Sequence, residues 1–150
     1  MIRVASVLVV FACGVTACGD DGEGPDSIAC TDHTGFVGVT VTTGLSVGFD
    51  WEPPCAVAFL IVQGEAGDQW IISTDNQQWD DPAYQSNRFA PPVTYGTNPQ
   101  GVDDTFGPED LFSGLTYELY LYRVLPENSS AVCQVQFGQV CLLALVEFVR

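Results

Sequence analysis

The fold of this 150-residue chain is decided by the stretch Leu111-Phe112-Ser113-Gly114-Leu115-Thr116-Tyr117-Glu118-Leu119-Tyr120-Leu121-Tyr122-Arg123-Val124. Leucine or tyrosine occupies every second position from Leu115 to Leu121, which is the period-two pattern of a half-buried β-strand. Serine and glycine just before it favour a turn. After residue 18 the chain carries no helical periodicity, so the stretch predicts a protein built from β-strands.

The rest of the chain repeats this pattern, with β-rich runs separated by Gly, Pro, Asp and Asn. In one run Leu45, Val47, Phe49 and Trp51 share a face at period two. A second run, residues 56–63, is continuously apolar and suits a central strand buried on at least part of both faces. The predicted strands are residues 36–42, 45–51, 56–63, 69–73, 91–96, 111–124 and 142–149. We therefore expect an all-β, antiparallel β-sandwich of about seven strands, with residues 91–96 on an edge.

The spacing of Leu111, Gly114 and Tyr117 is similar to the tyrosine corner of Greek-key sandwiches, in which the tyrosine hydroxyl bonds back to the preceding turn. Together with Trp51, which precedes Glu52-Pro53-Pro54, and the run 56–63, residues 36–149 resemble an immunoglobulin-like fold of the fibronectin type III family. The resemblance implies that Trp51 is the core tryptophan of the second strand and that Tyr117 is the corner tyrosine. It also places Phe59 where the third strand often has tyrosine.

The first eighteen residues have the features of an export signal. Arg3 precedes an apolar run at residues 4–11, and Val15-Thr16-Ala17 lead into Cys18. This ending resembles the bacterial lipoprotein signal, which implies cleavage before Cys18 and acylation of that cysteine. A transmembrane helix or a buried strand is the alternative, but the run is shorter than the roughly 20 residues that a span needs.

The sequence predicts three segments. Residues 1–17 are a cleaved signal peptide, residues 18–29 are a flexible acidic tether, and residues 30–150 are the sandwich. The expected location is the bacterial cell envelope, with lipidated Cys18 in a membrane and the domain in the periplasm or outside the cell. The acids directly after Cys18 resemble signals that route lipoproteins to the cell surface in some bacteria, which favours the outer membrane or the cell surface, although a solvated linker explains them equally well.

Four cysteines remain beyond the tether: Cys30, Cys55, Cys133 and Cys141. An even set in an oxidising compartment predicts two disulfides. Four cysteines allow three pairings, and Greek-key topology brings Cys30, Cys55 and the region of Cys133 to one pole. We therefore favour Cys30–Cys55 and Cys133–Cys141. A zinc site would need C-x-x-C spacing or more histidines than the single His33.

The net charge of the chain limits the classes of molecule that it can bind. The chain has four Lys or Arg residues, none of them lysine, against nineteen carboxylates, and its formal net charge is −15. Binding of nucleic acid is excluded, because it rests on cations that neutralise phosphate. The acidity favours cationic partners or divalent ions, or else reflects a soluble, self-repelling surface or adaptation to high salt.

Two candidate ligand sites follow from residue type. Asp80, Asp81, Asp103 and Asp104 offer oxygen ligands for calcium, although no D-x-D-x-D-G run is present and solvated loop acids explain them as well. No other cofactor is expected. Trp70, Trp79 and Tyr84 offer flat rings for stacking on sugars. The alternative is that Trp70 packs in the core in alternation with Ile72 and that Trp79 fixes a long loop.

Nothing in the chain favours catalysis. His33 is the sole histidine, no G-x-S-x-G is present, and adjacent carboxylates on a strand point apart. The expected function is that of a non-enzymatic, membrane-anchored structural or interaction module whose partner is an envelope protein or a glycan. A glycan-binding or calcium-dependent adhesion module is the alternative, and a carboxylate-based hydrolase is a remote one.

Overall fold

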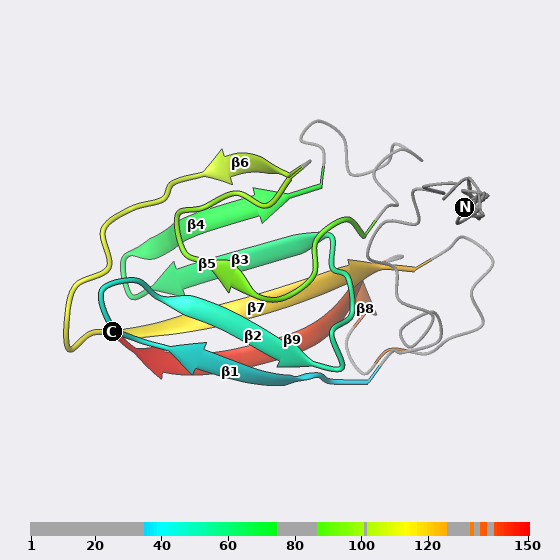
Figure 1. Ribbon diagram of the computed structural model, residues 1–150, viewed down its shortest axis with the longest axis horizontal. Coiled ribbons are helices and arrows are strands. Elements are labelled where there is room, and N and C mark those ends of the chain that lie inside the picture. The colour runs from blue at the N-terminus through cyan, green and yellow to red at the C-terminus, as the bar shows by residue number, and fades with distance from the viewer. Residues whose placement is uncertain (1–34, 75–86, 101, 126–132, 134–135, 138–139) are drawn as a thin grey trace, which may run out of the picture.

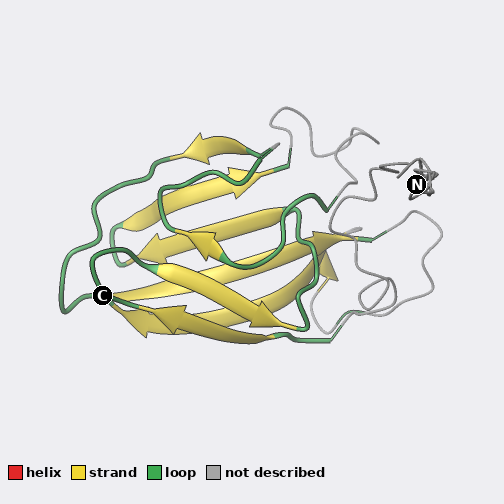
Figure 2. Ribbon diagram, viewed as in Figure 1, coloured by secondary structure: helices red, strands yellow, loops and turns green. Residues whose placement is uncertain are grey.

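The computed structural model describes residues 35–74, 87–100, 102–125, 133, 136–137 and 140–150. These residues form nine strands and no helix, so the predicted all-β class is confirmed (Figures 1 and 2). The strands are β1 (Gly38–Thr42), β2 (Gly48–Glu52), β3 (Phe59–Gly64), β4 (Gly67–Ser73), β5 (Val93–Thr94), β6 (Asp103–Phe106), β7 (Thr116–Val124), β8 (Gln136–Phe137) and β9 (Val140–Val149).

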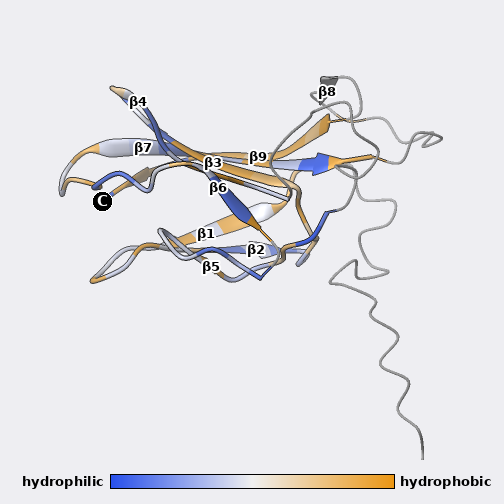
Figure 3. Cartoon of the chain, turned by 90° about the horizontal axis from the view of Figure 1, so that it is seen from above, coloured by the Kyte–Doolittle hydropathy of each residue, from blue (hydrophilic) through white to orange (hydrophobic). Residues whose placement is uncertain are grey.

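The strands make two antiparallel sheets that face each other. The smaller has the order β1-β2-β5, and the larger has the order β6-β4-β3-β7-β9-β8. Seen edge-on, the sheets are separate layers, with β1, β2 and β5 below and β3, β4, β7 and β9 above (Figure 3). The sheets come together near the start of β1, where the Val37 N–H donates to the Leu143 carbonyl at 2.8 Å.

The two strands beyond the expected seven are short. Strand β6 reads Asp-Asp-Thr-Phe with every residue exposed, and β8 has only two residues. Neither carries an alternating apolar pattern that sequence alone would reveal. Each is added at an edge by hydrogen bonding to a longer neighbour, β6 to β4 and β8 to β9.

In β2 and the residues just before it, the structure confirms most of the predicted buried face and corrects the position of Leu45. Val47, Phe49 and Trp51 are buried, but Leu45 is fully exposed. Pairing with β1 begins only at Gly48, opposite Thr42, so Leu45 lies in the connection before the ladder. The strand ends at Glu52, directly before Pro53, as the prolines predict.

The core fills the space between the sheets. Phe49 of the smaller sheet meets Phe148 of the larger one edge to face, with ring centroids 5.7 Å apart. The inward residues of β3, β4 and β7 complete the core, and several are fully buried: Leu60, Val62, Trp70, Ile72, Leu119 and Leu121. Trp51 also lies in this core, where its Nε1–H donates to the Cys55 carbonyl at 2.8 Å.

The turn before β7 is fastened by Tyr117. Its ring is buried against Phe148, and its hydroxyl accepts a hydrogen bond from the Phe112 N–H at 2.8 Å. This is the contact that the spacing of Leu111, Gly114 and Tyr117 predicts. Gly114 has a φ of 80°, a conformation that glycine adopts most readily.

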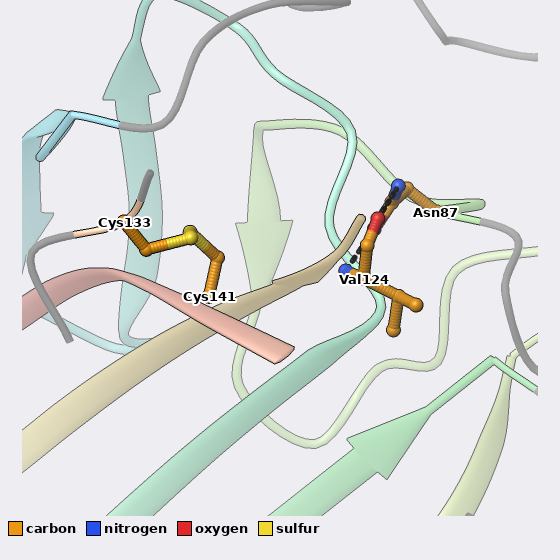
Figure 4. The surroundings of a disulfide bond; sticks show 4 residues. All are labelled: Asn87, Val124, Cys133 and Cys141. Atoms are coloured by element: carbon orange, nitrogen blue, oxygen red, sulfur yellow. Dashed lines mark hydrogen bonds between the residues drawn. A yellow bond between two sulfur atoms is a disulfide. The ribbon is translucent and has the colours of Figure 1, made fainter. Parts of the chain in front are cut away.

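The pole where β7 ends is held by a disulfide and by an amide side chain (Figure 4). Cys133 and Cys141 are disulfide-bonded with their Cα atoms 5.7 Å apart, as predicted. Cys55 is also disulfide-bonded, but the predicted partner Cys30 lies outside the described residues. Nearby, the Asn87 side chain donates to the Val124 carbonyl at 3.0 Å and accepts from the Val124 N–H at 2.9 Å. It thereby takes the place of a neighbouring strand at that residue.

Candidate functional site

The outward face of the larger sheet carries the candidate site, and β7 sets its centre. Because side chains alternate along a strand, the burial of Tyr117, Leu119 and Leu121 turns Glu118, Tyr120 and Tyr122 outward. The Tyr120 and Tyr122 rings are parallel, with an interplanar angle of 2° and centroids 6.3 Å apart. Tyr120 lies on the outside of the sheet, whereas Tyr122 is partly covered because it packs against the small buried cluster around Phe59.

An apolar row crosses this face from strand to strand. The registers place Ile61 opposite both Ile71 and Tyr120, and they continue the row to Phe106 at one end and Leu145 at the other. Phe106 is 44% exposed and Leu145 is 51% exposed. The solvated face of an antiparallel sheet is usually polar, so this apolar row makes the outward face a candidate binding surface.

A polar, acidic row runs beside the apolar row. Gln63 lies opposite Glu118, and Glu118 lies opposite Glu147. Like charges directly opposite each other on neighbouring strands repel. The Tyr120 hydroxyl donates to Glu118 Oε2 at 2.7 Å, and Gln63 Nε2 donates to Asp68 Oδ1 at 2.6 Å. The two rows are joined at Tyr120 and Glu118.

The acidic row continues into a groove of about 770 Å³ at one end of the sandwich. Its walls are the turn between β3 and β4, the start of β7 and the segment before β7. Phe112 and Leu115 contribute exposed apolar surface, while Glu65, Glu118 and Glu147 contribute carboxylates. No arginine is among the described residues that line the groove.

The surroundings of the tyrosine hydroxyl groups on this face shift their pKa values. The hydrogen bond to Glu118 raises the pKa of Tyr120, and burial adds to the effect. Burial alone raises the pKa of Tyr122. Both phenols therefore stay protonated at neutral pH, so the face carries its negative charge on the carboxylates alone.

The position of Trp70 corrects the proposed sugar-stacking surface. Its ring is completely buried, packs edge to face on Tyr95 with centroids 5.1 Å apart, and has no free face for a sugar. Trp70 belongs to the core together with Ile72, because both point inward from β4. The other two residues of that prediction, Trp79 and Tyr84, lie outside the described residues.

The predicted calcium ligands are only partly described. Asp103 and Asp104 are neighbours on β6, where successive side chains point to opposite faces, and Asp104 Oδ1 accepts from Trp70 Nε1–H at 3.0 Å. Asp80 and Asp81 lie outside the described part of the chain, as do Cys18 and His33. Within the described ranges, no three His, Cys, Asp or Glu side chains are grouped as metal ligands.

Sequence reasoning did not find the two rows. The outward position of Tyr120 can be read from the alternation in β7, but the row depends on which strands are neighbours and on their register.

In the part of the chain that the structure describes, no helix has the length and apolar character to cross a membrane. Comparisons with known protein families, with curated proteins and with solved structures found no match to this chain.

Proposed function

We propose that this chain is a non-enzymatic, lipid-anchored interaction module of a bacterial cell envelope, and that the outward face of its larger sheet is the binding surface. The observation that carries the proposal is the apolar row beside the acidic row, because a covered partner surface accounts for exposed Phe106 and Leu145. The single histidine and the lack of a nucleophile motif support a role in binding rather than catalysis.

The described chain begins at the end of the domain opposite the groove. In Figure 1 the described chain enters β1 at one end, and the β3–β4 turn, the start of β7 and the end of β9 lie at the other. The groove is at this second end. A protein held through Cys18 would therefore present the groove away from the membrane.

A relationship to fibronectin type III domains is part of the same proposal. It is supported by Trp51 in the core and by the hydrogen bond between the Tyr117 hydroxyl and the Phe112 N–H. Domains of this kind carry function on exposed loops and sheet surfaces, which agrees with the position of the two rows.

The anchor is tested by labelling bacteria that express the full chain with an alkyne fatty acid. Wild type should be labelled and should sediment with membranes, whereas Cys18→Ser should be unlabelled. Cys13→Ser is the matched control, because Cys13 would be removed with the signal, and it should be labelled like wild type. Mass spectrometry that finds wild type unlabelled and beginning at Met1 would contradict the proposal.

The binding surface is tested in the same cells with a photo-cross-linking amino acid. Incorporation at position 145 should give adducts of higher mass, while incorporation at position 45 should not, since Leu45 is equally apolar but lies in the β1–β2 connection. Equal adducts at both positions, or none at position 145, would show that this face is not a binding surface.

A further inference from the structure

We infer that the partner segment is a basic, apolar peptide in an extended conformation, which lies across the strands between the apolar row and the acidic row. This inference rests on the proposed function and names the chemistry of the ligand for that surface. It does not depend on lipidation.

The charge of the surface is uncompensated. Glu118 and Glu147 face each other across β7 and β9, Glu65 lies in the same groove, and no described arginine lines it. Like charges directly opposite each other on neighbouring strands are unfavourable in general. A lysine or arginine placed between Glu118 and Glu147 would offset such repulsion, and the overall charge of −15 would also speed the approach of a cationic partner.

The shape of the surface fits an extended peptide. Five neighbouring strands contribute to the apolar row, which is therefore about 19 Å long at roughly 4.8 Å between strands. Six extended residues span about 20 Å. The two rows are about 7 Å apart, since their residues are two positions apart along each strand. Successive side chains of an extended peptide point in opposite directions, so alternate residues would reach the two rows.

Tyr120 suits such a peptide at the junction of the rows. Its ring lies in the apolar row and its hydroxyl is fixed by Glu118 at 2.7 Å. A cation held by Glu118 would therefore lie beside the Tyr120 hydroxyl, where the two rows meet. Apolar side chains of the peptide would cover Ile61 and Leu145, which are half-buried and exposed respectively.

The two other occupants fit less well. A second copy of this chain in a two-fold contact would bring Glu118 and Glu147 against the same carboxylates. A glycan would stack on the tyrosines, but it would leave the aliphatic members of the row, Ile71 and Leu145, without an apolar partner and the carboxylates without a cation. Both are distinguished from the peptide by experiment.

The test measures binding to the purified full chain in a nonionic detergent by isothermal titration calorimetry. The probe is a capped six-residue peptide in which lysine alternates with leucine. The comparison probes replace lysine with glutamate, replace leucine with serine, or are a neutral hexasaccharide. We expect the lysine–leucine peptide to bind, the other three to bind at least about tenfold more weakly, and its affinity to fall severalfold between low and high salt.

Paired variants locate the site. Glu118→Gln and Glu147→Gln should each weaken binding severalfold, and Glu52→Gln, which removes the same single charge from the smaller sheet, should not. Leu145→Ser should weaken it similarly, and Leu45→Ser should not. Thermal melts confirm that each variant is folded.

Four results would overturn the inference: no binding of the lysine–leucine peptide, equal loss in the Glu52→Gln and Leu45→Ser controls, tighter binding of the hexasaccharide, or sedimentation of the free protein as a dimer blocked by Leu145→Ser. If cross-linking at position 145 persists while the peptide fails, the proposed function stands and only the partner chemistry is wrong. If both the cross-linking at position 145 and the peptide binding are absent, the proposed function itself is wrong.

Discussion

At the scale of single residues, Tyr117 connects the turn before β7 to the core. Its ring is buried beside Phe148, and its hydroxyl accepts from the Phe112 N–H, five residues earlier. Tyr117→Phe keeps the ring and leaves this N–H without its acceptor. We expect a loss of about 1 kcal/mol in the free energy of unfolding, measured by urea denaturation.

Tyr120→Phe is the matched control for this change. It removes a hydroxyl whose partner, Glu118, lies on the outward face and is hydrated when the bond is lost. Its effect should stay below about 0.5 kcal/mol. Equal unfolding midpoints for Tyr117→Phe and wild type would show that the Phe112 contact contributes nothing to stability.

At the scale of elements, the connection from β6 to β7 depends on Gly107. Its φ is 79°, and a Cβ there would collide with the Gln69 carbonyl on β4. That carbonyl already accepts hydrogen bonds from the Glu109 N–H at 2.8 Å and the Tyr95 hydroxyl at 3.2 Å. The glycine therefore permits the close approach of the connection to β4.

Gly107→Ala should cost more than about 2 kcal/mol, because it adds a collision with backbone to the strain of a positive φ. Gly114→Ala provides the comparison, since its φ is 80° but nothing lies within 4 Å of the added Cβ. It should cost roughly 1 kcal/mol. Chemical denaturation gives both values, and similar losses for the two variants would rule out the collision.

The individual strands also differ in whether the sequence predicts them. The alternation in β7 predicts its inward residues because burial on one face of a strand imposes period two. Strand β6 carries no such signal, since it exists only through pairing with β4. For the same reason the outward row of Ile61, Tyr120 and Leu145 was not predicted. Period two shows that Tyr120 points outward, but it does not show which strands lie beside β7.

At the scale of the whole molecule, alkaline pH should weaken the fold. Burial raises the pKa of Tyr95 from 10.0 to about 12, and the charge of Glu109 adds to it. Tyr120 and Tyr122 shift in the same direction. Since the folded protein holds these protons more tightly than the unfolded chain, the stabilisation is complete below about pH 10 and is lost as the pH rises through about 12.

Urea midpoints measured between about pH 9 and pH 12 check this expectation. The midpoint of wild type should fall over this range, and that of Tyr95→Phe should fall less steeply, although it starts lower because the bonds to Gln69 and Glu109 are gone. A wild-type midpoint that is constant up to pH 12 would contradict the raised pKa values.

The bond between the Val37 N–H and the Leu143 carbonyl has a mechanical consequence. If the chain is anchored at its N-terminal side and bound on the outward face, as proposed, tension would enter the domain at β1 and leave it through β9 and β7. It would cross from one sheet to the other at this bond and through the interleaved side chains around Phe49 and Phe148. The ladder between β1 and β2 would be sheared along its length, with its five residue pairs resisting together rather than opening one by one.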